Sequence, residues 1–237
     1  MKSNRGKYDS LILALLIILL IISSIILVMY FKIYANEEGL FTKVKSKNDG
    51  YYTVVIAGNT YDDKLSSIID SIITEDMSDY DKYKIIHDFV TKLVDYDYSA
   101  LNNMEAHELA SNPEHVLDTG WGICGGYARL YKDLCNEANL ECEVVTGWAD
   151  FLDDDTGHAW NAVKLTGNVY HVDCCWDDVI TEYGKYSWFL QGNNYVTNGC
   201  RKWTEQFNFS SESYPITRGS LEPYTFHIKY TSTEEES

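Results

Sequence analysis

The chain has 237 residues, 45% hydrophobic and 23% charged, with only 3 Pro and 15 Gly, which excludes a disordered chain, a collagen and a coiled-coil rod. Its 14% aromatic residues can build a hydrophobic core, so the six Cys could form bridges but are not needed to hold a fold. Residues 51–237 hold 12 Lys and Arg against 32 Asp and Glu, a net charge of −20, which argues against a nucleic-acid partner.

The first long apolar run extends from Leu11 to Phe31, 21 residues without a charge, which would span about 31 Å as a helix. We therefore expect a transmembrane helix at 11–31 after a cytoplasmic tail at 1–10. A cleaved signal peptide is the alternative, because a basic start and a small residue at Ala35 could serve one, although the run is long for that purpose. Lys2, Arg5 and Lys7 lie close before the run and favour a cytoplasmic N-terminus. We therefore expect a single-pass protein of the cell membrane whose C-terminal domain is extracytoplasmic.

Residues 32–50 are polar and charged, and we expect a tether there. The folded domain is expected at 51–230, with a frayed tail at 231–237. Its first elements should be a strand starting at Tyr51 and a helix over 65–73, where apolar residues keep helical spacing.

The next helix should start at 78–79, and a loop is expected through 112–113. Apolar residues at helical spacing then predict a helix over about 125–138, with Asn139 as its left-handed terminator. YSWFLQG could be a helix or a strand, and YTFHIKY predicts a final strand. Three strand-like runs directly follow the 125–138 helix, at 141–149, 158–165 and 168–174, and a tight turn joins the last two into an antiparallel hairpin.

Cys124 stands at the predicted start of the 125–138 helix. A helix N-terminus stabilises a thiolate through its dipole and its free N–H groups, and the same N–H groups could hold an oxyanion. The flanking Gly122, Gly125 and Gly126 would leave the backbone open to a substrate. A lone Cys in a glycine-rich stretch is more often structural, so the assignment depends on partners elsewhere in the chain.

Partners for Cys124 are found on the predicted hairpin. His158 and Asp173 would lie on neighbouring strands near the same end, so that Asp173 accepts the ring N–H of His158 and the other ring nitrogen faces the thiol. A strand His is more often a satisfied polar residue than a base. Only the joint arrangement of helix-start Cys, strand His and next-strand Asp favours catalysis.

Three blocks of this sequence resemble those of the transglutaminase-like superfamily: GICGGYA, GHAWNAV and YHVDCCWDD. The resemblance covers about 83–188 and implies an α+β, papain-like fold in which a Cys-bearing helix packs on an antiparallel sheet. It implies Cys124 as nucleophile, His158 as general base and then acid, and Asp173 as the orienting carboxylate, with no cofactor. Relatives often have Thr before the Trp of the third block, where this chain has Cys175.

Other residues near these blocks have competing interpretations. Trp121 and Trp160 could line an acyl-donor groove or belong to the core, and Tyr96 or Tyr98 could assist an oxyanion. A zinc site built on His158, His171, Asp173 and Cys175 is conceivable, but no ligand spacing supports it and no metal is expected. Adjacent Cys174 and Cys175 would point to opposite strand faces, and Asp153-Asp154-Asp155 predicts a solvated loop rather than a calcium site.

The sequence therefore predicts a membrane-anchored, extracytoplasmic thiol enzyme acting on amide bonds of a protein or peptide substrate through a thioester. Water as acceptor would make it a peptidase or amidase, and an amine would make it a transglutaminase. The alternative is a non-catalytic peptide-binding or cell-surface assembly module on the same fold.

Overall fold

The computed structural model describes most of the chain after residue 50, and the statements below concern these ranges: 51–149, 156–180, 186–193, 200–203, 207–216 and 223–231. The predicted membrane helix at 11–31, its flanking segments and the Asp153–Asp155 loop lie outside them. Each helix within these ranges is too short or too polar to cross a bilayer.

A four-stranded antiparallel sheet forms one layer of the fold. Its strands follow the order β6-β5-β4-β7: β4 (Cys142–Ala149), β5 (Thr156–Leu165), β6 (Asn168–Val172) and β7 (Cys200–Trp203). The hairpin between β5 and β6 was predicted and is confirmed, with Leu165 paired to Asn168 across a two-residue turn. Both turn residues, Thr166 and Gly167, have positive φ, as a type I′ turn requires.

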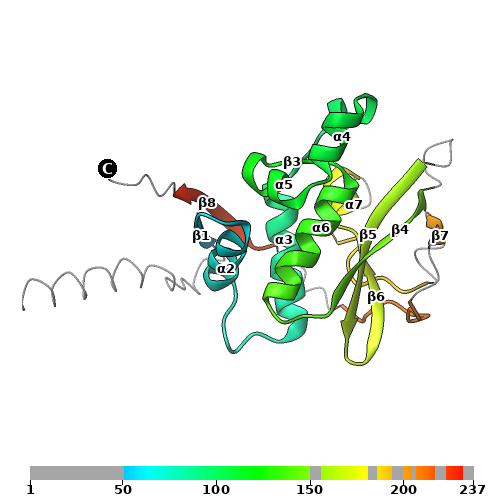
Figure 1. Cartoon of the computed structure of the whole chain (residues 1–237). Helices are drawn as coiled ribbons and strands as arrows, with labels where there is room; N and C mark the ends of the chain where they lie inside the picture. The colour runs from blue at the N-terminus through cyan, green and yellow to red at the C-terminus, as the bar shows by residue number, and fades with distance from the viewer. Residues whose placement is uncertain are drawn as a thin grey trace, which may run out of the picture. The chain divides into compact units, whose positions relative to one another are not determined.

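Helices cover one face of this sheet (Figure 1). Helix α6 (Cys124–Glu137) packs on β5 and also contacts α3 (Asp79–Leu93), so that it lies between the sheet and the rest of the helical layer. The other sheet face carries a smaller apolar cluster that includes Trp160, Trp176 and Phe209. The result is the predicted α+β architecture, with a Cys-bearing helix packed on an antiparallel sheet.

A second, two-stranded sheet joins the two ends of the described region. Strand β1 (Tyr51–Ala57) pairs in parallel with β8 (Thr225–Thr231), and α2 (Tyr61–Ile72) packs against β1. Both strands were expected from the sequence, and Thr231 still belongs to β8. Helices α2 and α3 each start with a capping box, in which Thr60 or Ser78 exchanges hydrogen bonds with an Asp three residues later.

The segment between α3 and α6 is largely helical, and the loop predicted through 112–113 is confirmed at Asn112 but not at Pro113, which is already helical. Asn112 caps the N-terminus of a short helix, and Pro113 occupies its first turn, where a missing N–H costs little. Strands of two residues on either side of these helices pair in parallel. The elements in chain order are β2 (Asp95–Tyr96), η2 (Tyr98–Asn102), α4 (Met104–Ala110), α5 (Pro113–Thr119) and β3 (Trp121–Gly122).

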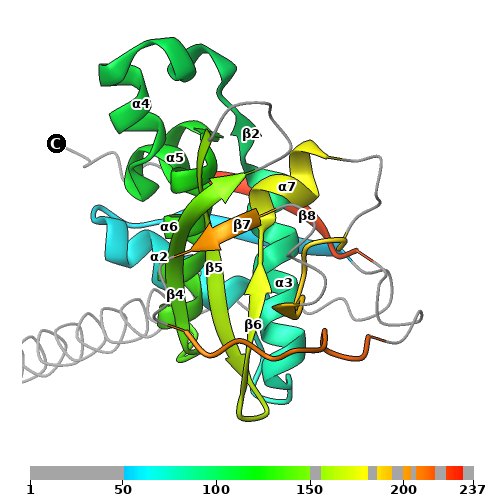
Figure 2. The same cartoon turned by 90° about the vertical axis from the view of Figure 1, so that its right-hand side faces the viewer.

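The strand predicted over 168–174 ends earlier than expected, at Val172. Asp173 then caps a short helix, α7 (Cys174–Val179), because its carboxylate accepts the N–H of Trp176. Cys174 and Cys175 are therefore buried in the first turn of a helix and do not point to opposite strand faces. Figure 2 shows α7 near the end of the sheet.

Candidate active site

Cys124 is the first residue of α6, as the sequence predicted. No side chain caps this helix, since Ile123 occupies the N-cap position, so the first-turn N–H groups are not used by a capping side chain. The first turn of α6 packs closely against α4 and α5 at Gly126. A Cβ at this position would lie 2.3 Å from the carbonyl oxygen of Ala110 and 2.7 Å from Val116. This glycine is required for packing of the helix start.

The Cys124 side chain is only partly exposed, and its environment favours the thiolate. Burial opposes ionisation, but a hydrogen bond and the charge of His158, together with the backbone N–H of Ala159, outweigh it and lower the pKa of Cys124. Ala159 and His158 are adjacent on β5, so a single strand supplies both interactions. The thiol is thus held at the junction of α6 and the central strand of the sheet.

His158 is buried between a carboxylate and an aromatic ring. Its Nε2 lies 2.6 Å from Oδ2 of Asp173, which leaves Nδ1 for Cys124. The Trp176 ring stacks on the imidazole at 4.4 Å between centroids and 10° between planes. Burial disfavours the imidazolium, but the charge and hydrogen bond of Asp173 and the contact with Cys124 raise the pKa of His158 to about 10.

Asp173 is positioned by three hydrogen bonds. Oδ2 bonds His158, Oδ1 accepts the Trp176 N–H at 3.0 Å, and the Asp173 N–H donates to the carbonyl of Trp188 at 3.0 Å. The structure thus brings Cys124, His158 and Asp173 together in one chain of contacts. Asp173 reaches His158 from the start of α7, directly after β6, and not from the strand position that the sequence suggested.

The residues considered for a substrate groove or for an oxyanion role differ in their burial and in their contacts. Trp160 is buried and donates its indole N–H to His171 at 2.9 Å, so it belongs to the core. Trp121 is 51% exposed three residues before the thiol. Tyr96 is partly buried near Cys124, and burial followed by the charge of Cys124 raises its pKa. Tyr98 is 64% exposed and packs against Tyr96, with the ring centroids 4.8 Å apart.

His171 takes part in a separate cluster. It stacks on Phe209 at 3.5 Å, accepts from Trp160 and lies 3.1 Å from Asn193, and burial lowers its pKa to about 4. In the part of the chain that the structure describes, no group of three or more His, Cys, Asp and Glu is arranged to hold a metal ion.

Trp176 is a site residue that sequence reasoning did not single out. It follows the capping Asp173 by three residues, so one turn of α7 carries both the hydrogen-bonding and the stacking partner of His158. An aromatic residue at that spacing after an N-cap Asp is the signal that could have identified it.

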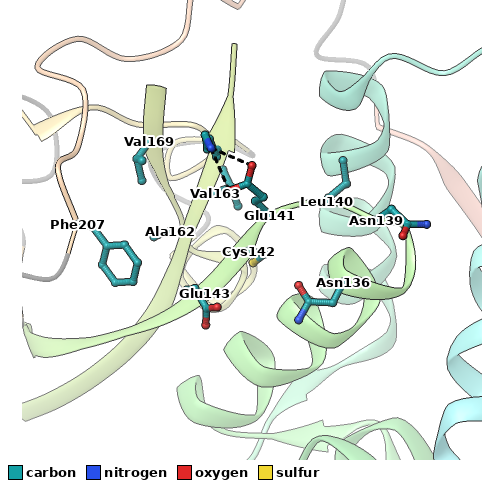
Figure 3. Close-up of a pocket in the computed structure, with 11 residues that line it drawn as sticks. Asn136, Asn139, Leu140, Glu141, Cys142, Glu143, Ala162, Val163, Val169 and Phe207 are labelled. Atoms are coloured by element: carbon teal, nitrogen blue, oxygen red, sulfur yellow. Dashed lines mark hydrogen bonds and ion pairs between the residues drawn. The ribbon is translucent and has the colours of Figure 1, made fainter. Parts of the chain in front are cut away.

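A pocket of about 430 Å³ lies at the other end of α6 (Figure 3). Asn136 and Asn139 line it near the end of the helix, Glu141 lines it just before β4, and Glu143 lines it from β4. Since 12 residues of helix rise about 18 Å, this pocket is far from Cys124. It has no part in the chemistry of the thiol.

The fold and the site define a class, the α+β proteins of papain-like and transglutaminase-like architecture. Residues 66–176 match the model of the transglutaminase-like superfamily, so this part of the chain is similar to the members of that superfamily.

Two curated relatives are kyphoscoliosis peptidases. The Mus musculus protein is 28% identical over 144 residues, 56% of this chain and 22% of its own length. The Homo sapiens protein is 29% identical over 120 residues, 47% of this chain and 18% of its own length. The chain thus spans about a fifth of the length of these relatives.

Solved structures are more distant. A candidate cysteine protease from Cytophaga hutchinsonii has a TM-score of 0.39 and 21% identity, with 51% of this chain and 40% of that one covered. A protein described as a TGase has a TM-score of 0.43 and 19% identity, and the match covers 84% of this chain and 48% of that one.

Proposed function

We propose that this protein is a membrane-anchored thiol enzyme that acts outside the cytoplasm on amide bonds of protein or peptide substrates. The observation that carries the proposal is the continuous contact from Cys124 through His158 to Asp173, which lowers the pKa of the thiol and raises that of the imidazole. A helix start, a strand and a second helix start supply these groups. Such an arrangement generates a nucleophile and a proton donor at neutral pH.

The proposed reaction has two steps. The Cys124 thiolate attacks the carbonyl carbon and forms a C–S bond, while N–H groups at the start of α6 stabilise the oxyanion. His158 then gives its proton to the leaving amine as the C–N bond breaks, and a thioester remains. In the second step neutral His158 takes a proton from the acceptor as the acceptor attacks the thioester carbon, the C–S bond breaks, and Cys124 leaves as the thiolate. Asp173 orients the ring throughout.

Water is the acceptor that we favour, because the curated relatives are named as peptidases. Transfer to an amine would use the same three residues, since the acceptor is selected by access to the thioester rather than by the triad. Adding a primary amine to the assay separates the two outcomes: a peptidase releases free acid, and a transglutaminase forms a new amide.

The proposed location depends on the sequence before the domain. The apolar run at 11–31 is long enough to span a bilayer, and the basic cluster of Lys2, Arg5 and Lys7 favours a cytoplasmic N-terminus. The domain would then meet extracytoplasmic substrates. Digestion of residues 51–237 by protease added to intact, wall-stripped cells supports this orientation, whereas their protection would refute it.

The decisive experiment is brief alkylation with iodoacetamide at pH 6, read by mass spectrometry, with wild type beside His158→Ala. Other thiols provide an internal control, since burial raises the pKa of Cys135, Cys174 and Cys175. Rapid labelling of Cys124, lost in the variant, is the expected result. Slow labelling that His158→Ala does not change would favour the peptide-binding module.

A further inference from the structure

Helix α3, which contacts α7, buries a lysine, a histidine and an aspartate within about one turn. Lys84 is 2% exposed, and His87 and Asp88 are fully buried. Buried charges are costly unless they are paired, so each should have a partner. Lys84 Nζ lies 2.9 Å from Oδ2 of Asp88, and Tyr186 donates its hydroxyl to the same oxygen at 2.7 Å.

His87 lies between two carboxylates. Its Nδ1 is 3.3 Å from Oδ1 of Asp88, and its Nε2 is 2.9 Å from Oδ2 of Asp177 on α7. Burial disfavours the charged ring, but its hydrogen bonds to both carboxylates outweigh burial and raise the pKa of His87. Burial also raises the pKa of Asp177, and the hydrogen bond and charge of His87 oppose that rise.

Asp177 connects this cluster to the active site. It lies one turn after Asp173 on α7, and its N–H donates to the Asp173 carbonyl at 3.1 Å. The backbone of Trp188 bridges the two residues, because its N–H donates to Oδ1 of Asp177 at 2.9 Å and its carbonyl accepts the N–H of Asp173 at 3.0 Å. Whatever holds Asp177 therefore also fixes the helix start that presents Asp173 and Trp176 to His158.

We propose that His87 is a positioning residue for the Asp173–His158 pair and acts through Asp177. The role rests on the proposed thiol chemistry, and it concerns geometry rather than contact with substrate. The His87–Asp177 contact joins α3 to α7 across 90 residues of sequence. Without it, the Asp177 carboxylate would be buried with no cation, and α7 would have to move or Asp177 would have to take up a proton.

The test compares three variants in the full chain. His87→Leu removes both ring hydrogen bonds, His87→Gln keeps an amide N–H for Asp177, and Phe89→Leu is the matched control. Phe89 is fully buried on the same helix and packs on Phe226, and its side chain has no group that could hydrogen-bond Asp177. All three are measured for melting temperature and for the pH dependence of Cys124 alkylation.

We expect His87→Leu to raise the midpoint of the alkylation profile by about one pH unit and to slow labelling at pH 6 by about tenfold. His87→Gln should recover most of that loss. Phe89→Leu should lower the melting temperature and leave the midpoint in place. A merely structural role for His87 predicts the same unchanged midpoint in His87→Leu, and that result would overturn the proposal.

A second readout separates this proposal from the proposed function. NMR titration of the His158 ring reports its pairing with Asp173 even if Cys124 reacts slowly. An unactivated thiol in the wild type refutes the enzyme, while a fall in the His158 pKa in His87→Leu still supports the positioning role. If His87→Leu does not fold, Asp177→Asn gives the same comparison, because its amide can still accept the Trp188 N–H. An unchanged His158 titration in that variant would refute the role.

Discussion

The substitution Asp173→Asn tests the electrostatics of the site most directly. The amide keeps the shape of the side chain and can still accept the Trp176 N–H that caps α7, so the main loss is the negative charge beside His158. The rise in the His158 pKa from 6.5 to about 10 corresponds to about 5 kcal/mol in favour of the protonated ring, shared between Asp173 and Cys124 and net of burial.

Removal of one opposite charge at this distance changes a pKa by about 1 to 3 units. We therefore expect Asp173→Asn to lower the pKa of His158 by about that amount and to slow the alkylation of Cys124. The sign follows from the ion pair: a ring that binds its proton less tightly makes the neutral thiol and imidazole more stable relative to the thiolate and imidazolium, and we expect this effect to exceed the relief of repulsion between the Asp173 carboxylate and the thiolate.

The assay is the rate of iodoacetamide labelling of Cys124 from pH 4 to pH 9, measured by mass spectrometry with circular dichroism as a folding control. In the wild type, labelling should already be fast below the usual pKa of a thiol. An Asp173→Asn profile that overlays the wild-type profile, in a folded protein, would refute the role of the carboxylate.

Three further predictions concern stability. The pKa of His171 falls from 6.5 to about 4 on folding, so the native state gains about 3 kcal/mol of stability as pH rises between these values. Urea unfolding at pH 4 and pH 7 should therefore show a smaller pH dependence of stability in His171→Gln than in the wild type. Trp176→Ala removes a buried ring stacked on His158, and we expect a loss of about 3 to 5 kcal/mol in urea unfolding together with slower alkylation. Gly126→Ala forces a methyl against the Ala110 carbonyl and should lower the free energy of unfolding by about 1 to 3 kcal/mol; an unchanged value would contradict the close approach.

Local signals allowed part of this fold to be predicted from sequence. Asn139 marks the end of α6 because its φ of 58° is one that Asn tolerates, and the Leu140 N–H then returns to the Cys135 carbonyl at 2.9 Å. The start of α3 was likewise predicted, because a capping box at Ser78 is a short-range motif. These features depend on neighbours within one or two turns.

The sequence-based predictions were wrong where contacts between residues far apart in the chain determine the local structure. Helices α4 and α5 have seven residues each, too few to be stable alone, and they depend on packing against neighbouring elements. Residues 172–176 have strand-like composition, but the Asp173 cap and its bond to Trp188 turn the chain into α7. The contact between His87 and Asp177 spans 90 residues, and no local pattern indicates it.

The parallel pairing of β1 with β8 has a consequence for the order in which the domain is assembled. Tyr51 pairs with Thr225, so a contact with very high sequence separation closes the fold. The backbone N–H of Tyr224, just before β8, also donates to Asp88 at 3.0 Å, inside the buried charge cluster. A growing chain cannot complete that cluster until the segment carrying Tyr224 and β8 has emerged, so the full set of contacts to Asp88 forms late in the synthesis of this domain.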